Sequence, residues 1–305
     1  VYVKQHKMYL KLDDSSKDIS VLLNPDTTHN CVEGHKVLVE ITERLKNHLY
    51  LGDVLKIIGH KNDPQVDILS IAYKYGIYED FNPRVIEELD DIPDEVDSSE
   101  LKNRRDLTDK VIFTIDGDDT KDIDDAISLE KDGDNYVLGV HIADVSNYVK
   151  ENTALGDEAY NRGTSSYLAD TVIPMLPHKL SNGICSLNEG VIRLSMSCVM
   201  TYNPEGQLVS YDIFPSYLKS RKKMTYKNVN KIIMENTIPD GYEDFADTLK
   251  EMHKLAKILR KAKERRGYID FDLDEVKIIQ DEKGCAIDIE KRVRGEGEKL
   301  IEDFM

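Results

Sequence analysis

Short apolar runs separated by polar turns fill the first part of the chain. The runs lie at residues 9–12, 19–23, 36–41 and 49–58. A turn about every ten residues is typical of a small β structure made of short strands. Gly52 interrupts the last run, as a β-bulge or a sharp bend would. The pattern over residues 1–59 favours a small barrel of the OB type, with a fragment of a β-sandwich as the alternative.

Residues 60–108 read as a connector. An apolar helical pattern covers residues 68–75. From Glu79 to Lys102 the chain then carries ten acidic and two basic side chains, with prolines at 83 and 93. This composition predicts an acidic linker that contains one short helix.

Strand and helix patterns alternate over residues 109–305. The strand-like runs lie at residues 111–115, 126–129, 136–141, 191–202 and 208–214. Turn signals at Asp132-Gly133 and at residues 203–206 predict two hairpins. Residues 248–266 form a long helix pattern whose outer face is strongly basic. Its apolar stripe consists of Leu249, Met252, Leu255, Ala256, Leu259 and Ala262. The fold class is therefore α+β, with an OB-type barrel followed by a mixed α/β domain.

Charge and cysteine content change this picture only in part. The net charge of −17 argues against a partner with a phosphate backbone, but nearly half of it lies in the acidic linker. The four cysteines at 31, 185, 198 and 285 form no CxxC pair and have no histidine at zinc-ligand spacing. We therefore expect reduced thiols in a cytoplasmic protein. No apolar run approaches the length of a membrane-spanning helix, and the first residues lack the core of a signal peptide.

Both ends of the sequence look cut. The chain begins without Met, and residues 299–305 keep a helical pattern with no capping residue. We therefore expect a piece of a longer protein whose last domain is truncated at its C-terminus.

Six aspartates crowd into ten residues directly after the apolar run that ends at Ile115. They are Asp116, Asp118, Asp119, Asp122, Asp124 and Asp125. Carboxylates this close repel one another, so they stay charged together only when cations neutralise them or water solvates them. Oxygen ligands in this number suit Mg²⁺ or Mn²⁺ better than zinc, and two such ions can clamp a phosphodiester. A solvated acidic turn without a function is the alternative.

Other chemistries fail on spacing. An EF-hand loop starting at Asp116 would need Gly at its sixth position and Glu at its twelfth, where Lys121 and Ile127 stand. The sequence contains no GxxxxGK[ST] phosphate loop, no GxSxG elbow and no HExxH pair. Residues 116–125, named the aspartate loop below, are therefore the strongest candidate for catalysis.

The spacing of these aspartates resembles the signature of the ribonuclease II / ribonuclease R family of exoribonucleases, in its catalytic RNB domain. Asp116 is followed after five residues by Asp122, and then by Asp124 and Asp125. Further blocks in family order are VHIADV at 140–145, IPMLP at 173–177, CSL at 185–187, RLSMS at 193–197 and LIEDFM at 300–305. The N-terminal module resembles the cold-shock domain of the same family.

The resemblance implies a processive, Mg²⁺-dependent 3′→5′ exoribonuclease that hydrolyses RNA to nucleoside 5′-monophosphates. Its partner would be the 3′ end of single-stranded RNA, and we expect a monomer. The implied catalytic and metal-binding residues are Asp116, Asp122, Asp124 and Asp125, of which Asp124 is tied most closely to catalysis. Tyr167 matches the aromatic residue that stacks near the 3′-terminal nucleotide. Glu302 matches a carboxylate that lines the catalytic cavity.

Two departures from the family pattern limit what this stretch of chain is expected to do. Only Tyr9 supplies an aromatic ring in the strand at 8–11, and residues 18–21 lack the expected aromatic, so we expect weak RNA binding by the N-terminal module. The later segment of the RNB domain, which supplies an arginine near the scissile phosphate, and the S1 domain have no match here. We therefore expect little activity from these residues alone. The alternatives are a catalytically silent RNB-like protein that binds RNA or a partner, and a magnesium nuclease that acts on DNA.

Three further groups of residues lie near the aspartate loop in the sequence or carry positive charge. His141 and Asp144 follow a strand close to the aspartate loop, and we expect them to support the site rather than to react. The basic run of Lys219 and residues 221–223 either follows phosphates or is a solvated surface. The basic face of residues 248–266 is expected to face solvent or another domain.

Overall fold

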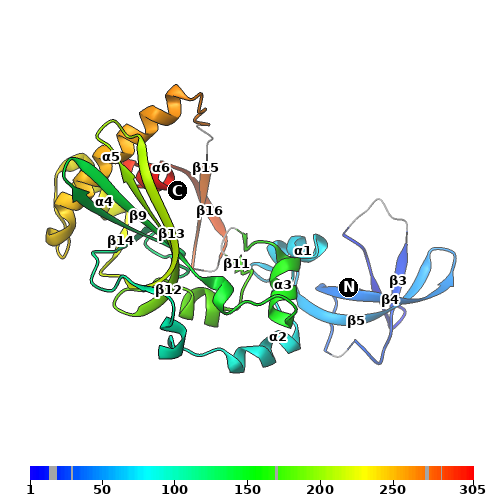
Figure 1. Ribbon diagram of the computed structural model, residues 1–305. Helices are drawn as coiled ribbons and strands as arrows, with labels where there is room; N and C mark the ends of the chain where they lie inside the picture. The colour runs from blue at the N-terminus through cyan, green and yellow to red at the C-terminus, as the bar shows by residue number, and fades with distance from the viewer. Residues whose placement is uncertain (14–18, 29, 169–170, 272–274, 283) are drawn as a thin grey trace. The chain divides into compact units, whose positions relative to one another are not determined.

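The computed structural model describes residues 1–305 except 14–18, 29, 169–170, 272–274 and 283 (Figure 1). Asp18, in the run at 18–21 discussed above, lies outside the described residues. The chain forms two compact units. The first comprises Val1–Asp80, Ser165–Ile173 and Val276–Glu290, and the second comprises Phe81–Thr164, Pro174–Glu275 and Lys291–Met305. Among the helices of the described residues, none has the length and apolarity that crossing a bilayer requires.

A five-stranded sheet forms the main part of the first unit. Its strands are β1 (Tyr2–Lys4), β2 (Lys7–Leu10), β3 (Ser20–Leu23), β4 (His35–Lys46) and β5 (Leu49–His60), in the order β1-β2-β3-β5-β4. The N-terminal amine of Val1 donates to the carbonyl of His35 (2.7 Å), and the N–H of Gly34 donates to the carbonyl of Val1 (3.0 Å). These bonds join the two edges of the sheet, β1 and β4. The sheet therefore curls toward the barrel expected of an OB fold.

Gly52 of β5 leaves room for side chains of the two neighbouring strands, β4 and β3. A β-bulge in β4, between Ile41 and Glu43, falls opposite it. A Cβ atom at position 52 would lie 2.5 Å from Cγ1 of Val39 and 2.8 Å from Cγ1 of Val21. The bulge indicated by the glycine is confirmed, but its extra residue belongs to the neighbouring strand.

The acidic segment after the first unit is ordered and packed. Helix α1 (Val66–Lys74) confirms the helical pattern at 68–75 and is followed by α2 (Pro83–Glu88) and by single 3₁₀ turns at Leu89–Asp91 and Ser98–Leu101. Val85 is fully buried, and Ile92 is buried in the same cluster as Leu180. The short helix is therefore as predicted, and from Phe81 on the segment packs as part of the second unit, because its apolar residues at helical spacing are buried there.

A second five-stranded sheet, in the order β6-β13-β12-β9-β8, organises the second unit. Its strands are β6 (Arg105–Asp106), β8 (Asp125–Asp132), β9 (Asn135–Ala143), β12 (Ile192–Tyr202) and β13 (Leu208–Lys219). Both predicted hairpins are confirmed, as β8–β9 and β12–β13. Strands β7 (Thr114–Asp116) and β14 (Lys223–Thr225) pair in parallel, and residues 113 and 127 bridge β7 to β8. Two separate hairpins are β10 (Ser166–Tyr167) with β11 (Val172–Ile173) and β15 (Glu275–Gln280) with β16 (Ala286–Arg292).

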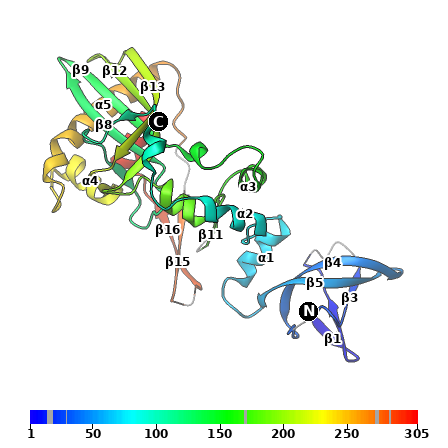
Figure 2. The same cartoon turned by 60° about the horizontal axis from the view of Figure 1, so that its bottom comes forward.

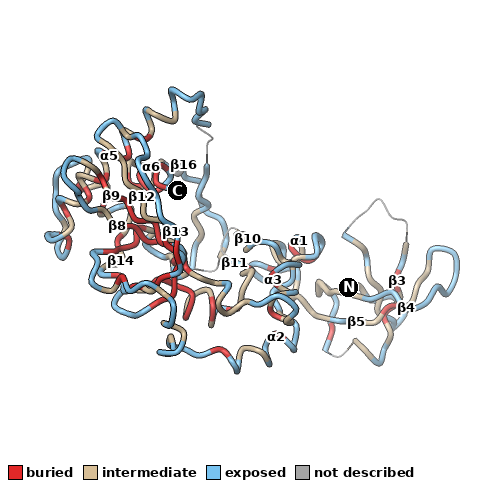
Figure 3. The backbone as a smooth tube through the Cα atoms, in the orientation of Figure 1, coloured by how far each residue is buried: buried red, intermediate tan, exposed pale blue. Residues whose placement is uncertain are grey.

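Helices cover one face of this sheet. They are α4 (Tyr226–Glu235), α5 (Ala246–Arg265) and α6 (Glu296–Phe304), and α3 (Ala154–Arg162) lies elsewhere in the unit. Figures 1 and 2 both show α4 and α5 next to the sheet, and Figure 3 shows that the buried residues concentrate there. Leu249, Met252 and Leu255 of α5 are fully buried, which confirms the predicted helix and its apolar stripe. The core that results holds β7, β8 and β14 in fixed register beside the aspartate loop.

Candidate active site

The two ends of the aspartate loop belong to neighbouring strands of the second unit. Strand β7 ends at Asp116 and β8 begins at Asp125. The N–H of Phe113 donates to the carbonyl of Ile127 (3.1 Å), and the N–H of Ile127 donates back to Phe113 (2.9 Å). On its other side β7 pairs with β14, where Thr225 stands opposite Asp116. The strands therefore fix both ends of the loop.

The middle of the loop is fixed by residues far away in the sequence. Ile123 is fully buried, and its N–H donates to Oγ of Ser186 (3.0 Å). The same hydroxyl donates to the carbonyl of Lys121 (2.9 Å), and the N–H of Leu187 donates to the carbonyl of Ile123 (2.8 Å). Ser186 is itself fully buried. The side chain of Ile123 and the hydroxyl of Ser186 together hold the backbone between Asp122 and Asp124.

Two more contacts complete this support. The N–H of Ala143 on β9 donates to the carbonyl of Asp124 (2.8 Å). The ammonium group of Lys223 on β14 donates to the carbonyl of Thr120. The backbone of the aspartate loop is therefore anchored at both ends and in its middle.

The carboxylates of the loop act on one another electrostatically. Burial, followed by the charge of Asp125, raises the pKa of Asp116 to about 7, with smaller contributions from Asp124 and Asp122 and an opposing one from Lys223. Burial and then Asp124 raise the pKa of Asp125. Asp124 keeps an exposed surface, yet the protein around its carboxylate and the charge of Asp122 raise its pKa as well. All four aspartates of the signature therefore belong to one electrostatic cluster.

The donor chemistry of this cluster fits a hard divalent cation. Oδ2 of Asp116 is buried and has no hydrogen-bond partner, which is costly for a carboxylate oxygen. A bound cation would offset both the burial and the mutual repulsion that raise the three pKa values. Within the described residues, however, no three His, Cys, Asp or Glu side chains are grouped so that they could hold a metal ion. The set of donors, and not a formed coordination shell, is therefore what supports a cation here.

His141 and Asp144 have structural partners. Nδ1 of His141 lies 2.7 Å from Oγ of Ser197 and Nε2 lies 3.1 Å from Oγ of Ser128. Burial lowers the pKa of His141 to about 4, so the ring is neutral at pH 7 and both of its nitrogens are engaged. Asp144 forms a nearly buried ion pair with Arg104 (2.6 Å). Both side chains therefore have partners outside the aspartate loop, and their support of the site stays a prediction.

Tyr167 lies in the β10–β11 hairpin, which belongs to the first unit, whereas the aspartate loop belongs to the second. The residue is 69% exposed, so it presents surface on which a base could stack. Its role at the 3′ end of RNA stays a prediction.

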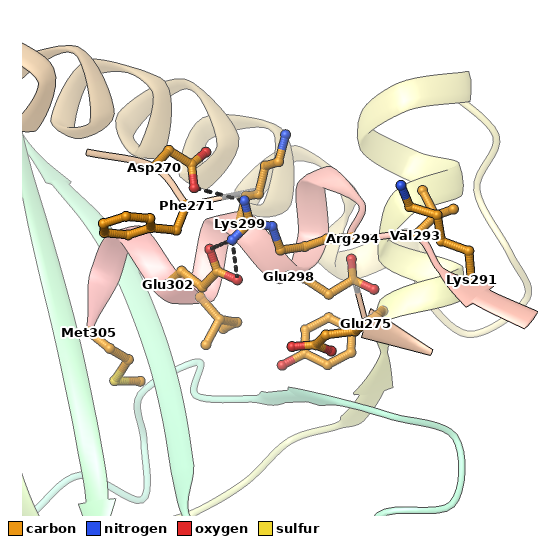
Figure 4. A pocket seen from close by; sticks show the side chains of 12 residues that line it. Asp270, Phe271, Glu275, Lys291, Val293, Arg294, Glu298, Lys299, Glu302 and Met305 are labelled. Carbon is orange, nitrogen blue, oxygen red and sulfur yellow. Dashed lines mark hydrogen bonds and ion pairs between the residues drawn. The ribbon is translucent and has the colours of Figure 1, made fainter. Parts of the chain in front are cut away.

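Glu302 lies on α6 and lines a pocket of about 1020 Å³ (Figure 4). Its carboxylate pairs with Arg294 (3.1 Å), which also pairs with Asp270 (2.9 Å). The remaining lining residues are Tyr226, Phe271, Glu275, Lys291, Val293, Glu298, Lys299, Ile301 and Met305. Tyr226 directly follows Thr225, the register partner of Asp116, so one wall of this pocket begins at the strand beside the aspartate loop. The cavity role of Glu302 stays a prediction.

Ser186 and Lys223 are the residues that sequence reasoning missed as parts of the site. Ser186 stands in the CSL block of the family resemblance, but the block assigned no task to it. Lys223 belongs to the basic run, whose members have different partners in the structure. Arg221 donates to the carbonyl of Thr108 (2.9 Å), and Nζ of Lys222 lies 5.7 Å from the ring centroid of Tyr242.

Comparisons with known proteins give a family match for each of the two parts of the chain. Residues 104–305 match the family model of the RNB domain, and residues 9–82 match that of the cold shock domain. The ribonuclease R of Thermotoga maritima is 52% identical to this chain over 256 residues, which cover 83% of the chain and 36% of that protein.

Two solved structures of Mycoplasma genitalium RNase R are also similar. The complex with ribose methylated single-stranded RNA has a TM-score of 0.86 at 30% identity and covers 94% of this chain and 45% of its own. The complex with double-stranded RNA has the same TM-score and identity and covers 94% and 51%. The chain thus spans about a third to a half of the length of these proteins.

Proposed function

This chain belongs to the RNB family, and we propose that it contributes the aspartate site of an exoribonuclease that shortens RNA from its 3′ end with Mg²⁺ and releases nucleoside 5′-monophosphates. The observation that carries the proposal is the aspartate loop: four carboxylates of one electrostatic cluster are held on an anchored backbone, and one of their oxygens is buried without a partner. The similar proteins are named ribonuclease R, and two of their structures contain RNA, which supports RNA as the substrate class.

Each part of the site has a task in this proposal. Asp116, Asp122, Asp124 and Asp125 bind Mg²⁺, which supplies charge neutralisation at the phosphate and activation of a water molecule. Ser186 and Lys223 keep the loop in shape, so that the carboxylates need little reorganisation when substrate arrives. The charge of Lys223 also favours the ionised form of Asp116, which is the form that binds a cation.

The RNA contacts are proposed for two residues outside the loop. Tyr167, a residue that is 69% exposed, stacks on the terminal base, and such stacking contributes about 1–3 kcal/mol per base. Glu302 lines the pocket that begins beside β14, with its charge balanced by Arg294.

The test uses the complete gene product and single-stranded RNA labelled at its 5′ end. In the presence of Mg²⁺ we expect stepwise shortening of the labelled strand and accumulation of nucleoside 5′-monophosphates. Asp124→Asn should abolish shortening while RNA binding, followed by fluorescence anisotropy, persists. Equal turnover by the parent and Asp124→Asn would remove the assignment.

Two measurements separate the alternatives. Calorimetric titration with Mg²⁺ should show binding that Asp124→Asn weakens, whereas a catalytically silent relative need not bind the ion. Substrates that end in ribose or deoxyribose distinguish an RNA-directed from a DNA-directed nuclease, because the 2′-OH is the chemical group by which proteins tell the two apart.

A further inference from the structure

Four lysines form a straight row along α5, on the side opposite to its buried stripe. Lys250, Lys254, Lys257 and Lys261 follow one another at intervals of four, three and four residues. At 3.6 residues per turn, this spacing places them within about 60° of one another around the helix and over about 16 Å of its length. The last three are exposed and Lys250 is half-buried.

Most of this row takes no part in the ion pairs of the residues that the structure describes. On the side of α5 that faces α6, Arg260 pairs with Asp303 (2.7 Å) and His253 pairs with Glu296 (3.0 Å). In the row only Lys254 has an ion-pair partner, Glu251 (2.5 Å). Across the described part of the chain, the other three lysines form no ion pair with a carboxylate. Lysines three and four residues apart repel one another and weaken the helix, so the row has a cost that the fold itself does not offset.

The row is also unusual in this particular chain. The net charge is −17, so most of the surface repels a polyanion. The aspartate loop repels phosphates as well, because its carboxylates are already crowded. A nuclease built in this way needs positive charge elsewhere to capture its substrate, and α5 presents four lysines with Glu251 as the only acidic residue between the first and the last of them.

We propose that the lysine row of α5 binds the phosphate backbone of RNA, as a contact separate from the aspartate loop. Lysine carries a single charge on a flexible side chain and lacks the two parallel N–H donors of arginine. It therefore suits contacts to backbone phosphates, which do not depend on the base sequence. A line of charges over about 16 Å suits an extended strand better than a small anion. The choice of RNA rests on the proposed function, whereas the electrostatic argument holds for the row by itself.

The experiment measures binding of fluorescent single-stranded RNA to the full chain in EDTA, where metal-dependent hydrolysis is blocked, at several salt concentrations. The test variant is Lys254→Glu, Lys257→Glu and Lys261→Glu together. The control reverses three exposed lysines on separate elements, Lys74, Lys102 and Lys277, and so changes the net charge equally. A second variant replaces the three row lysines with arginine and keeps their charge.

We expect the row reversal to weaken binding about tenfold or more near 0.1 M salt. It should also make the slope of log K against log salt less steep by about 2, because each phosphate contact to a single strand contributes about 0.7. The arginine variant should keep the parent slope. A row reversal with the same slope and affinity as the control overturns the proposal.

Two further outcomes have defined meanings. If the row reversal leaves RNA binding unchanged but releases the chain from vesicles that contain anionic lipid, the row is a membrane contact and the RNA proposal fails. If the complete gene product hydrolyses no RNA while the slope still changes as expected, the proposed function fails and the RNA-binding row stands.

Discussion

Replacing Ser186 with alanine tests whether the aspartate loop works because it is anchored. The change removes one hydroxyl from a fully buried position and leaves the packing of the backbone otherwise intact. The N–H of Ile123 then loses its acceptor at 3.0 Å, and because Ile123 is fully buried this N–H cannot turn to water. The carbonyl of Lys121, on an exposed residue, can do so.

The expected loss of stability follows from the single orphaned N–H. An unsatisfied buried donor costs about 1–3 kcal/mol. For a unit of this size, a loss of about 2 kcal/mol lowers the melting temperature by roughly 4–8 °C. Thermal unfolding followed by circular dichroism measures the change.

The effect on the reaction should be larger than the effect on the fold. The freed backbone lies between Asp122 and Asp124, and a displacement of about 1 Å in reacting groups can reduce the rate about 100-fold. We therefore expect the turnover of RNA per folded molecule to fall by about 10- to 100-fold in the complete gene product. Calorimetric affinity for Mg²⁺ should fall with it.

Ser195→Ala is the matched control. Ser195 is equally buried, and its hydroxyl bonds to the hydroxyl of Ser216 (2.7 Å) inside the sheet rather than to the loop. It should lower stability by less than Ser186→Ala, because the hydroxyl of Ser216 keeps the hydroxyl of Ser197 and the carbonyl of Ser195 as partners, while turnover per folded molecule stays close to that of the parent. If Ser186→Ala and Ser195→Ala reduce turnover equally, anchoring by Ser186 is not what keeps the site active.

Three further predictions concern charge and packing. Because the pKa of Asp116 is raised to about 7, this carboxyl stabilises the cation-free fold below pH ~4 and loses that contribution as the pH rises toward 7. The variant Asp116→Asn should therefore have a higher melting temperature than the parent at pH 8 in EDTA, but not near pH 4. An equal difference in melting temperature at both pH values would contradict the raised pKa. Arg104→Met should lower the free energy of unfolding in urea by about 3–5 kcal/mol, because it leaves the nearly buried Asp144 without its ion-pair partner at 2.6 Å. A loss below 1 kcal/mol would show that the ion pair is solvated. Gly52→Ala should destabilise the first unit by about 1–3 kcal/mol, because the new Cβ would lie 2.5 Å from Cγ1 of Val39. Amide hydrogen exchange in β4 and β5 should become faster, and unchanged exchange would show that the strands can separate without cost.

The sequence by itself determined much of the local structure and which residues are the candidates for the site. Alternation of apolar and polar residues on either side of Asp132-Gly133 was enough to predict the β8–β9 hairpin, because strand period and turn chemistry are local properties. The 3.6-residue period of Leu249, Met252 and Leu255 predicted α5 in the same way. The spacing of the aspartates pointed to a cation site on charge repulsion alone.

Only the tertiary structure decided which groups hold those aspartates and how charged they are. Ser186 meets Ile123 across 63 residues, and Lys223 meets Thr120 across 103. Such contacts depend on which strands are neighbours and in which register, and the period of a single strand carries no information about its partner. The raised pKa of Asp116 is of the same kind, because burial and the approach of Asp125 exist only after β7, β8 and β14 have come together.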